Sequence, residues 1–223
     1  MTKIVSHPAK YSDALIPVMA SMLDFPNIKS ILDPFAGTGK IFELYGYLGN
    51  EIKIEGIEIE SEWVSLDERL TLGNALELKY SDDLFDAICT SPSYGNKMAG
   101  KMSKDIDKGR WRRIKYADSL HRDLSTDNSA NFVWGRKYRE FHVKAWMEAR
   151  RVLKNNGYLI LNIKNHIREG KEQLVTEWHM GTLTLLGFDV TDHIHVPVPS
   201  MRFGRNSEKR ISYESVIRFK LYK

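Results

Sequence analysis

The sequence has little of what marks several large classes of protein. Its single cysteine, Cys89, excludes an internal disulfide, and the apolar run DAICT around it predicts a buried, reduced thiol that suits the cytoplasm. No apolar run approaches the roughly 18 residues that a membrane-spanning helix needs. The opening segment MTKIVSHPAKYSDALIP lacks the apolar core of a secretory signal. We therefore expect a cytoplasmic protein without a membrane partner.

Repeats and low-complexity tracts are also absent, which excludes solenoids and long disordered linkers. The 223 residues are 42% hydrophobic and 28% charged, which is typical of a soluble globular chain. This length suits one substantial domain, which we expect to span residues 1–223.

The net charge is only +4, but it is unevenly distributed. Between Lys97 and Arg139, twelve Lys and Arg residues stand against five Asp and Glu. The basic stretch favours a polyanion-binding site, although a solvated loop with chance charge has the same composition. The segment 95–136 also lacks clear periodicity, and insertions of this length are usually functional or disordered. We expect it to be a basic target-recognition insertion or a lid.

Apolar runs rich in β-branched residues alternate with helical periods along the chain. Strands are expected at 30–34, 53–59, 85–90, 158–163, 189–198 and 213–221, and helices at 13–23, 40–48, 138–153 and 172–186. The long helix at 138–153 is followed by Asn155-Asn156-Gly157, which is expected to be its C-terminal stop signal. This alternation predicts an α/β fold with a mainly parallel sheet covered on both faces. Ligands of such sheets bind beyond the carboxyl ends of the strands.

A glycine-rich loop, DPFAGTG, follows the first of these strands. Its residues are Asp33, Pro34, Phe35, Ala36, Gly37, Thr38 and Gly39. Two glycines before a helix let backbone N–H groups approach a ligand closely. A P-loop is one alternative, but Pro34 stands where its first glycine belongs and Ile41 replaces its hydroxyl. A dinucleotide fingerprint is another, but Phe42 occupies the place of its third glycine.

Two groups follow the next strands. Glu58 ends the strand at 53–59, where a carboxylate can accept both hydroxyls of a ribose; it would otherwise be one surface acid among several. Asn74 and Ala75 follow a third possible strand, where the amide can meet an adenine edge or form an ordinary turn. Together with the glycine loop, Glu58 favours a nucleoside site.

The strand at 85–90 stops abruptly on TSPSY, which alone could be a plain strand-ending turn. The pair DPFAGTGK and TSPSY resembles the motifs of S-adenosylmethionine-dependent DNA amino-methyltransferases, which usually read DPF-x-G-x-G and [DNS]-P-P-[YFW]. The segments HPAKYSDALI and RVLKNNGYLILNIKN also resemble that family, and the motif order resembles its gamma arrangement. One departure is Ser93, which stands where a second proline is usual.

The resemblance implies a Rossmann-like class I methyltransferase with a mainly parallel seven-stranded sheet, helices on both faces and an antiparallel last strand. It implies S-adenosyl-L-methionine as the cofactor, bound by the glycine loop 33–39 together with Lys10, Glu58, Asn74 and Ala75. It implies that the target base is held by the catalytic residues Ser91, Pro92, Ser93 and Tyr94.

The implied reaction moves a methyl group from a sulfonium to the exocyclic amine of a flipped base. The Ser91 hydroxyl and the Pro92 carbonyl can accept the amine protons and help to localise the nitrogen lone pair. Tyr94 can stack on the base. In the resembled family serine at the first motif position goes with cytosine N4, so Ser91 favours that base over adenine N6. The chemistry needs neither a metal nor a covalent nucleophile.

The basic insertion interleaves cations with aromatic residues and is the expected DNA contact. A second basic loop near the end of the sequence either contacts the DNA backbone or simply connects a hairpin. The predicted DNA-binding residues are Lys97, Lys101, Lys108, Arg110, Trp111, Arg112, Arg113, Lys115, Arg202 and Arg205.

Other interpretations stay open at this point. His193 and His195 share one face of a strand, but no third ligand lies nearby in the sequence, so we expect no metal site. One rival function keeps the cofactor and methylates RNA, a protein amide or a small molecule. A second rival is a non-catalytic nucleic-acid-binding module. The oligomeric state is left open.

Overall fold

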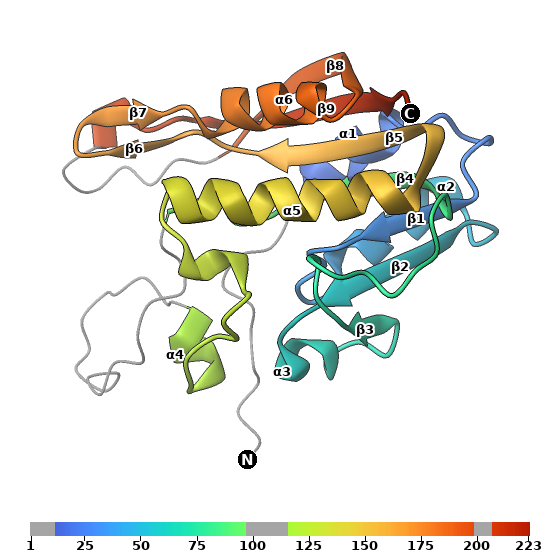
Figure 1. The fold of residues 1–223 in the computed structure, drawn as a ribbon, viewed down its shortest axis with the longest axis horizontal. Coiled ribbons are helices and arrows are strands. Elements are labelled where there is room, and N and C mark those ends of the chain that lie inside the picture. Colours follow the sequence, from blue (N-terminus) through green and yellow to red (C-terminus); the bar gives the residue numbers. More distant parts are fainter. Residues whose placement is uncertain (1–11, 97–115, 199–206) are drawn as a thin grey trace.

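The computed structural model describes residues 12–96, 116–198 and 207–223. Seven strands form one sheet, and their bounds in sheet order are β3 (Leu70–Leu72), β2 (Lys53–Glu58), β1 (Ser30–Asp33), β4 (Phe85–Thr90), β5 (Leu153–Ile163), β9 (Tyr213–Leu221) and β8 (Phe188–Pro197). β1 to β5 run parallel, and β9 is antiparallel to both of its neighbours. The expected seven-stranded, mainly parallel sheet with an antiparallel last strand is confirmed (Figure 1).

Helices cover both faces of this sheet because successive strand residues are apolar and point to opposite sides. Ile31, Cys89 and Ile160 pack in a cluster with α1 (Leu15–Ser21), η1 (Lys40–Leu44) and α2 (Tyr45–Leu48). The alternate residues, such as Leu32 and Ile88, pack in a second cluster with α5 (Arg136–Val152) and α6 (Val175–Leu185). Figure 1 shows α5 lying across one face of the sheet, with α1 and α2 behind it.

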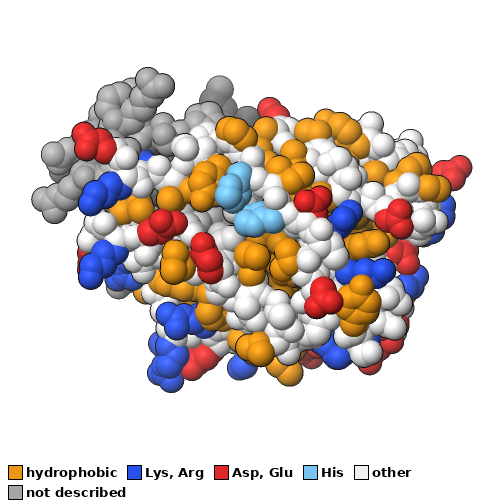
Figure 2. All heavy atoms as spheres, turned by 90° about the horizontal axis from the view of Figure 1, so that it is seen from above, with side chains coloured by type: hydrophobic (Ala, Val, Ile, Leu, Met, Phe, Trp, Pro, Cys, Tyr) orange, Lys and Arg blue, Asp and Glu red, His pale blue; other side chains and the backbone are white. Residues whose placement is uncertain are grey.

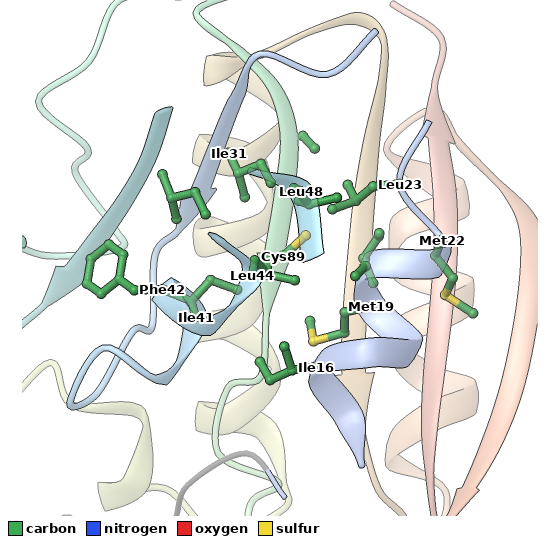
Figure 3. Close-up of a cluster of buried hydrophobic side chains, with 14 of the residues drawn as sticks. Ile16, Met19, Met22, Leu23, Ile31, Ile41, Phe42, Leu44, Leu48 and Cys89 are labelled. Carbon is green, nitrogen blue, oxygen red and sulfur yellow. The ribbon is translucent and has the colours of Figure 1, made fainter. Parts of the chain in front are cut away.

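Figure 3 shows the first cluster from within. Ile16 and Met19 of α1 meet Ile41 and Leu44 of η1, and Cys89 reaches the same cluster from β4. The Cys89 thiol is fully buried, as the sequence predicts, and burial raises its pKa well above the usual range.

α5 ends at Val152, within one residue of the predicted end at 153, but the interpretation of Asn155-Asn156-Gly157 as the stop signal after the helix is wrong. β5 begins at Leu153, directly after the helix, so these three residues lie inside the strand. The register with β4 shifts between Phe85 and Ala87, because the β5 segment bulges there and Asn156 adopts φ 63°. Gly157 is required at this bulge, since an added Cβ would lie 2.9 Å from the Asp86 carbonyl oxygen.

Short elements complete the chain. They are α3 (Ser61–Val64), α4 (Tyr116–Leu120), η2 (Ser129–Asn131), β6 (His166–Arg168), β7 (Lys171–Gln173) and η3 (Ser207–Lys209). β6 and β7 pair as a separate hairpin that follows β5 and projects from the sheet (Figure 1). Among the described residues, no helix is long and apolar enough to cross a bilayer.

Candidate active site

The glycine loop connects β1 to η1, and the side chain of Asp33 holds the start of the loop in place through hydrogen bonds. The Asp33 carboxylate is fully buried and accepts hydrogen bonds from the Phe35 N–H, at 2.9 Å, and from the Thr90 hydroxyl, at 2.6 Å. Because Thr90 ends β4, this contact ties the glycine loop to the strand that carries TSPSY. Gly37 and Gly39 have φ values of 56° and 81°, which side-chain-bearing residues rarely adopt.

Glu58 lies at the carboxyl end of β2 with its carboxylate against the glycine loop. It is buried and accepts three backbone N–H groups, from Gly37 at 3.1 Å, Ile59 at 2.9 Å and Glu60 at 2.8 Å. Burial raises the pKa of the Glu58 carboxyl to about 8, and the three N–H donors act in the opposite direction. The structure thus places this carboxyl beside the loop.

Asn74 follows β3 and connects that turn to the segment after α4. Its side-chain oxygen accepts from the Leu76 N–H at 2.9 Å, and its amide nitrogen donates to the Asp127 carboxylate, also at 2.9 Å. Ala75 is buried and packs in a cluster with Phe141 of α5. The amide edge of Asn74 is therefore paired with an acid that comes from a distant part of the sequence.

These groups line one cleft at the carboxyl ends of β1, β2 and β4. It encloses about 520 Å³, part of which is open to solvent. Nine of the predicted site residues line it: Pro34, Phe35, Gly37, Glu58, Asn74, Ala75, Ser91, Pro92 and Ser93. The other described members of the glycine loop, which do not line the cleft, are Asp33, Ala36, Thr38 and Gly39. Tyr94 does not line it either.

Tyr94 is instead part of a hydrogen-bond network at the ends of β4, β5 and β9. Its hydroxyl donates to the Glu214 carboxylate and lies within hydrogen-bond distance of the Ser91 hydroxyl, both at 3.2 Å. The Asn162 side-chain nitrogen lies 3.1 Å from the Ser91 oxygen, 3.0 Å from the Tyr94 oxygen and 2.9 Å from the Glu214 oxygen. Burial and the nearby Glu214 charge raise the pKa of Tyr94 well above its usual range.

A second buried chain of hydrogen bonds holds the backbone of the corner. The Tyr138 hydroxyl of α5 donates to the Ser93 carbonyl oxygen at 2.8 Å and lies 2.9 Å from His179 Nε2. Trp146 Nε1 donates to His179 Nδ1 at 3.0 Å. Because an indole nitrogen only donates, His179 carries its proton on Nε2 and donates it to Tyr138. Burial lowers the pKa of His179 well below its usual range, so the ring stays neutral.

α4 and the segment after it form another wall of the cleft. Tyr116, Asn128 and Ser129 line it, and the Ser129 hydroxyl accepts from Ser93 Oγ at 3.1 Å. The segment is attached through Glu60, whose fully buried carboxylate accepts from Arg122, Ser125 and Asn128 at 2.7–3.0 Å. Sequence reasoning placed this stretch in a basic insertion but did not identify its cleft-lining residues, because they form no recognisable motif.

Other predictions fall outside the described residues. These are the cofactor residue Lys10 and the ten DNA-binding residues Lys97, Lys101, Lys108, Arg110, Trp111, Arg112, Arg113, Lys115, Arg202 and Arg205. His193 and His195 are exposed on the edge strand β8. On the face of the molecule drawn in Figure 2, histidine side chains sit among hydrophobic ones. The ring of His195 stacks on Tyr213. Across the described ranges, no cluster of three or more His, Cys, Asp or Glu could hold a metal ion.

Comparison with known proteins gives fold matches without close sequence relatives. No family model matches the sequence, and no curated protein matches it significantly. A SAM-dependent methyltransferase from Methanosarcina mazei superposes with a TM-score of 0.56 and 18% identity, covering 92% of this chain and 97% of its own. Another from Aquifex aeolicus gives 0.54 and 14%, covering 94% and 89%. The fold is that of the Rossmann-like methyltransferases.

A match to TrmN from Thermus thermophilus, with a TM-score of 0.54 and 15% identity, covers 93% of this chain but only 48% of that protein. The same methyltransferase fold also occurs in a structure described as the [4+2]-cyclase SpnF, with a TM-score of 0.56 and 17% identity. Since one fold carries these different names, the reaction has to be argued from the site.

Proposed function

We propose that this protein transfers a methyl group from S-adenosyl-L-methionine to the exocyclic amine of a base in DNA, with cytosine N4 as the preferred target and adenine N6 as the alternative. The observation that carries the proposal is the single cleft in which the glycine loop and Glu58 face the Ser91-Pro92-Ser93 corner. A nucleoside site and a set of amine-accepting groups are thereby adjacent, as transfer between two bound partners requires.

The donor set of the cleft fits the adenosyl part of the cofactor. A carboxylate has about four acceptor positions, and three N–H groups occupy three of those on Glu58, so one remains for a ribose hydroxyl. The Asp127 carboxylate beside Asn74 supplies an acceptor for an adenine amine. The bound cofactor supplies an electrophilic methyl group on its sulfonium.

The corner residues supply acceptors for the amine that receives the methyl group. Ser91 and Pro92 line the cleft, and a proline favours extended geometry in the residue before it. The Tyr138 hydrogen bond on the next carbonyl, that of Ser93, keeps the corner from shifting. Stacking of Tyr94 on the base stays a prediction, since its ring packs against the cluster shared by α5 and α6.

The deciding experiment is a labelled-methyl assay with the purified protein on duplex DNA, RNA and protein substrates, followed by nucleoside analysis. The proposal expects label in DNA as N4-methylcytosine, and N6-methyladenine would select the alternative. If the label appears only in RNA or only in protein, that substrate class would replace DNA in the proposal. If calorimetry detects no binding of S-adenosylmethionine, the remaining candidate function is a non-catalytic nucleic-acid-binding module.

The charge pattern supports a nucleic-acid substrate, because the basic insertion interleaves cations with aromatic residues. Replacing both Arg112 and Arg113 by Ala is expected to weaken DNA binding and to lower the slope of log K against log salt by about two, roughly one for each lost phosphate contact. Fluorescence anisotropy at several salt concentrations measures this slope. Replacing the exposed Lys137 and Lys144 on α5 is the matched control, and an unchanged slope for the arginine variant would remove those residues from the interface.

A further inference from the structure

We infer that Glu214 is the terminal proton acceptor of the methyl transfer, reached from the cleft through the Ser91 and Tyr94 hydroxyls. The inference rests on the proposed function. It concerns a residue on β9, far from every sequence motif, which the fold brings to the catalytic corner.

The network around Tyr94 has a direction. A carboxylate only accepts, so Tyr94 donates to Glu214, at 3.2 Å. Its oxygen is then an acceptor for the Ser91 hydroxyl, also at 3.2 Å. The Asn162 amide occupies one acceptor position of the Ser91 oxygen, which leaves one more. Ser91 is the member of this network that lines the cleft, so that position is available to an incoming N–H.

The chemistry requires such an acceptor. As the methyl carbon bonds to the amine nitrogen, its bond to sulfur breaks and that electron pair stays on the neutral thioether. The nitrogen then carries a positive charge and one proton too many. That proton moves to the Ser91 oxygen as the Ser91 proton moves to Tyr94 and the Tyr94 proton moves to Glu214. The products are a neutral methylated amine, restored hydroxyls and a protonated Glu214.

The carboxylates at or next to the cleft have different partners. Asp33 holds the glycine loop, Glu58 faces that loop and Asp127 pairs with Asn74. Among the described residues, Lys164, directly after β5, interacts electrostatically with Glu214. Tyr94 interacts electrostatically with the phenols of Tyr116 and Tyr138. These groups and Glu214 therefore determine the electrostatic environment of the Tyr94 hydroxyl.

The test compares wild-type protein with Glu214→Gln and Tyr94→Phe in single-turnover methyl transfer to duplex DNA over a range of pH, in H₂O and D₂O. Glu214→Gln keeps an oxygen that accepts from Tyr94, and Tyr94→Phe keeps the ring while removing the relay hydroxyl. Asp189→Asn, on the exposed part of β8, is the matched control. Calorimetry with S-adenosylmethionine and thermal melting check binding and folding.

We expect both variants to lower the single-turnover rate on the order of 100-fold, the lower range for a positioned proton acceptor. Cofactor affinity stays within about threefold, because the network lies outside the nucleoside site. The wild-type rate falls on acidification and in D₂O, and both variants lose this dependence. If Glu214→Gln does not fold, Tyr94→Phe alone decides.

Two negative results are distinguishable. In the first, the wild type methylates DNA and a folded variant keeps the full rate and the wild-type pH profile. This result would overturn the inference and leave the proposed function standing. No transfer to DNA by the wild type would remove the proposed function and the inference with it.

Discussion

At the scale of single residues, Glu58 is under opposing influences. Its carboxyl is buried, which raises its pKa to about 8, yet three N–H groups point at it and favour the charged form. A ribose hydroxyl also donates and so prefers the carboxylate. Cofactor binding and ionisation of Glu58 are therefore coupled, and each favours the other.

This coupling predicts tighter cofactor binding at higher pH. With a pKa of about 8, the ionised fraction rises about tenfold between pH 7 and pH 9, so the dissociation constant for S-adenosylmethionine falls by about the same factor. Calorimetry across this range measures it. Glu58→Gln is expected to lose the effect and Glu55→Gln, on the same strand, to retain it. Identical pH profiles for wild type and Glu58→Gln would contradict the coupling.

The same group affects stability in a definite direction. Its pKa in the folded chain lies above its ordinary value of 4.5, so the folded state holds more protons between pH 4.5 and pH 8. This contribution to the free energy of unfolding is therefore fully present below that window and is lost as pH rises through it.

At the scale of elements, the carboxylate of Glu60 makes the most hydrogen bonds to the segment from α4 to η2, which is also linked through the Asn74–Asp127 and Ser93–Ser129 hydrogen bonds. Glu60 precedes α3 and, fully buried, accepts from a guanidinium, a hydroxyl, an amide and a backbone N–H. Removing it leaves several of these donors without a partner, and buried donors without partners are unfavourable. Apolar residues of the segment, among them Tyr116 and Leu120, also pack on Trp63 of α3, so the Glu60 hydrogen bonds and this cluster together position one wall of the cleft.

We therefore expect Glu60→Ala to accelerate hydrogen exchange in residues 116–131 while exchange in α5 stays slow. Affinity for S-adenosylmethionine falls as well, since Asn128 and Ser129 line the cleft. Glu68→Ala, at an exposed position nearby, is the control. Unchanged exchange in 116–131 would show that the segment is held by other contacts.

The elements also show what sequence patterns can and cannot predict. The glycine loop and the corner were predictable because each needs special backbone residues next to a strand. The direct passage from α5 into β5 was not, because Asn156 and Gly157 suit a β-bulge as well as they would a stop after a helix. Tyr138 and His179 read as ordinary residues of amphipathic helices, and only their packing brings them together under Ser93. The β6–β7 hairpin was missed because its strands are three residues each.

At the scale of the whole molecule, the cleft is built from residues far apart in the chain. Its walls come from the ends of three parallel strands and from the segment that Glu60 holds. A ligand that bridges these walls binds only the folded chain, so it stabilises the entire fold by mass action.

S-adenosylmethionine at about 100 times its dissociation constant should raise the free energy of unfolding by about 2.7 kcal/mol. For a chain of this size that corresponds to an increase in Tm of about 5–10 °C. Thermal melting monitored by circular dichroism measures this increase. The Tm of Glu58→Ala should rise much less at the same cofactor concentration. A Tm that does not respond to the cofactor would contradict a nucleoside site in this cleft.

The position of β9 has a consequence for folding. β9 lies between β5 and β8, so β5 and β8 belong to the same sheet only after β9 has paired with both. β5 and β8 precede β9 in the chain, so until β9 pairs, β5 has a strand neighbour only in β4 and β8 has none in the sheet. Because Glu214 lies on β9, the pairing of β9 that completes the sheet also brings Glu214 to Tyr94 at the corner. A chain in which β9 has not yet paired therefore lacks both the complete sheet and the complete corner.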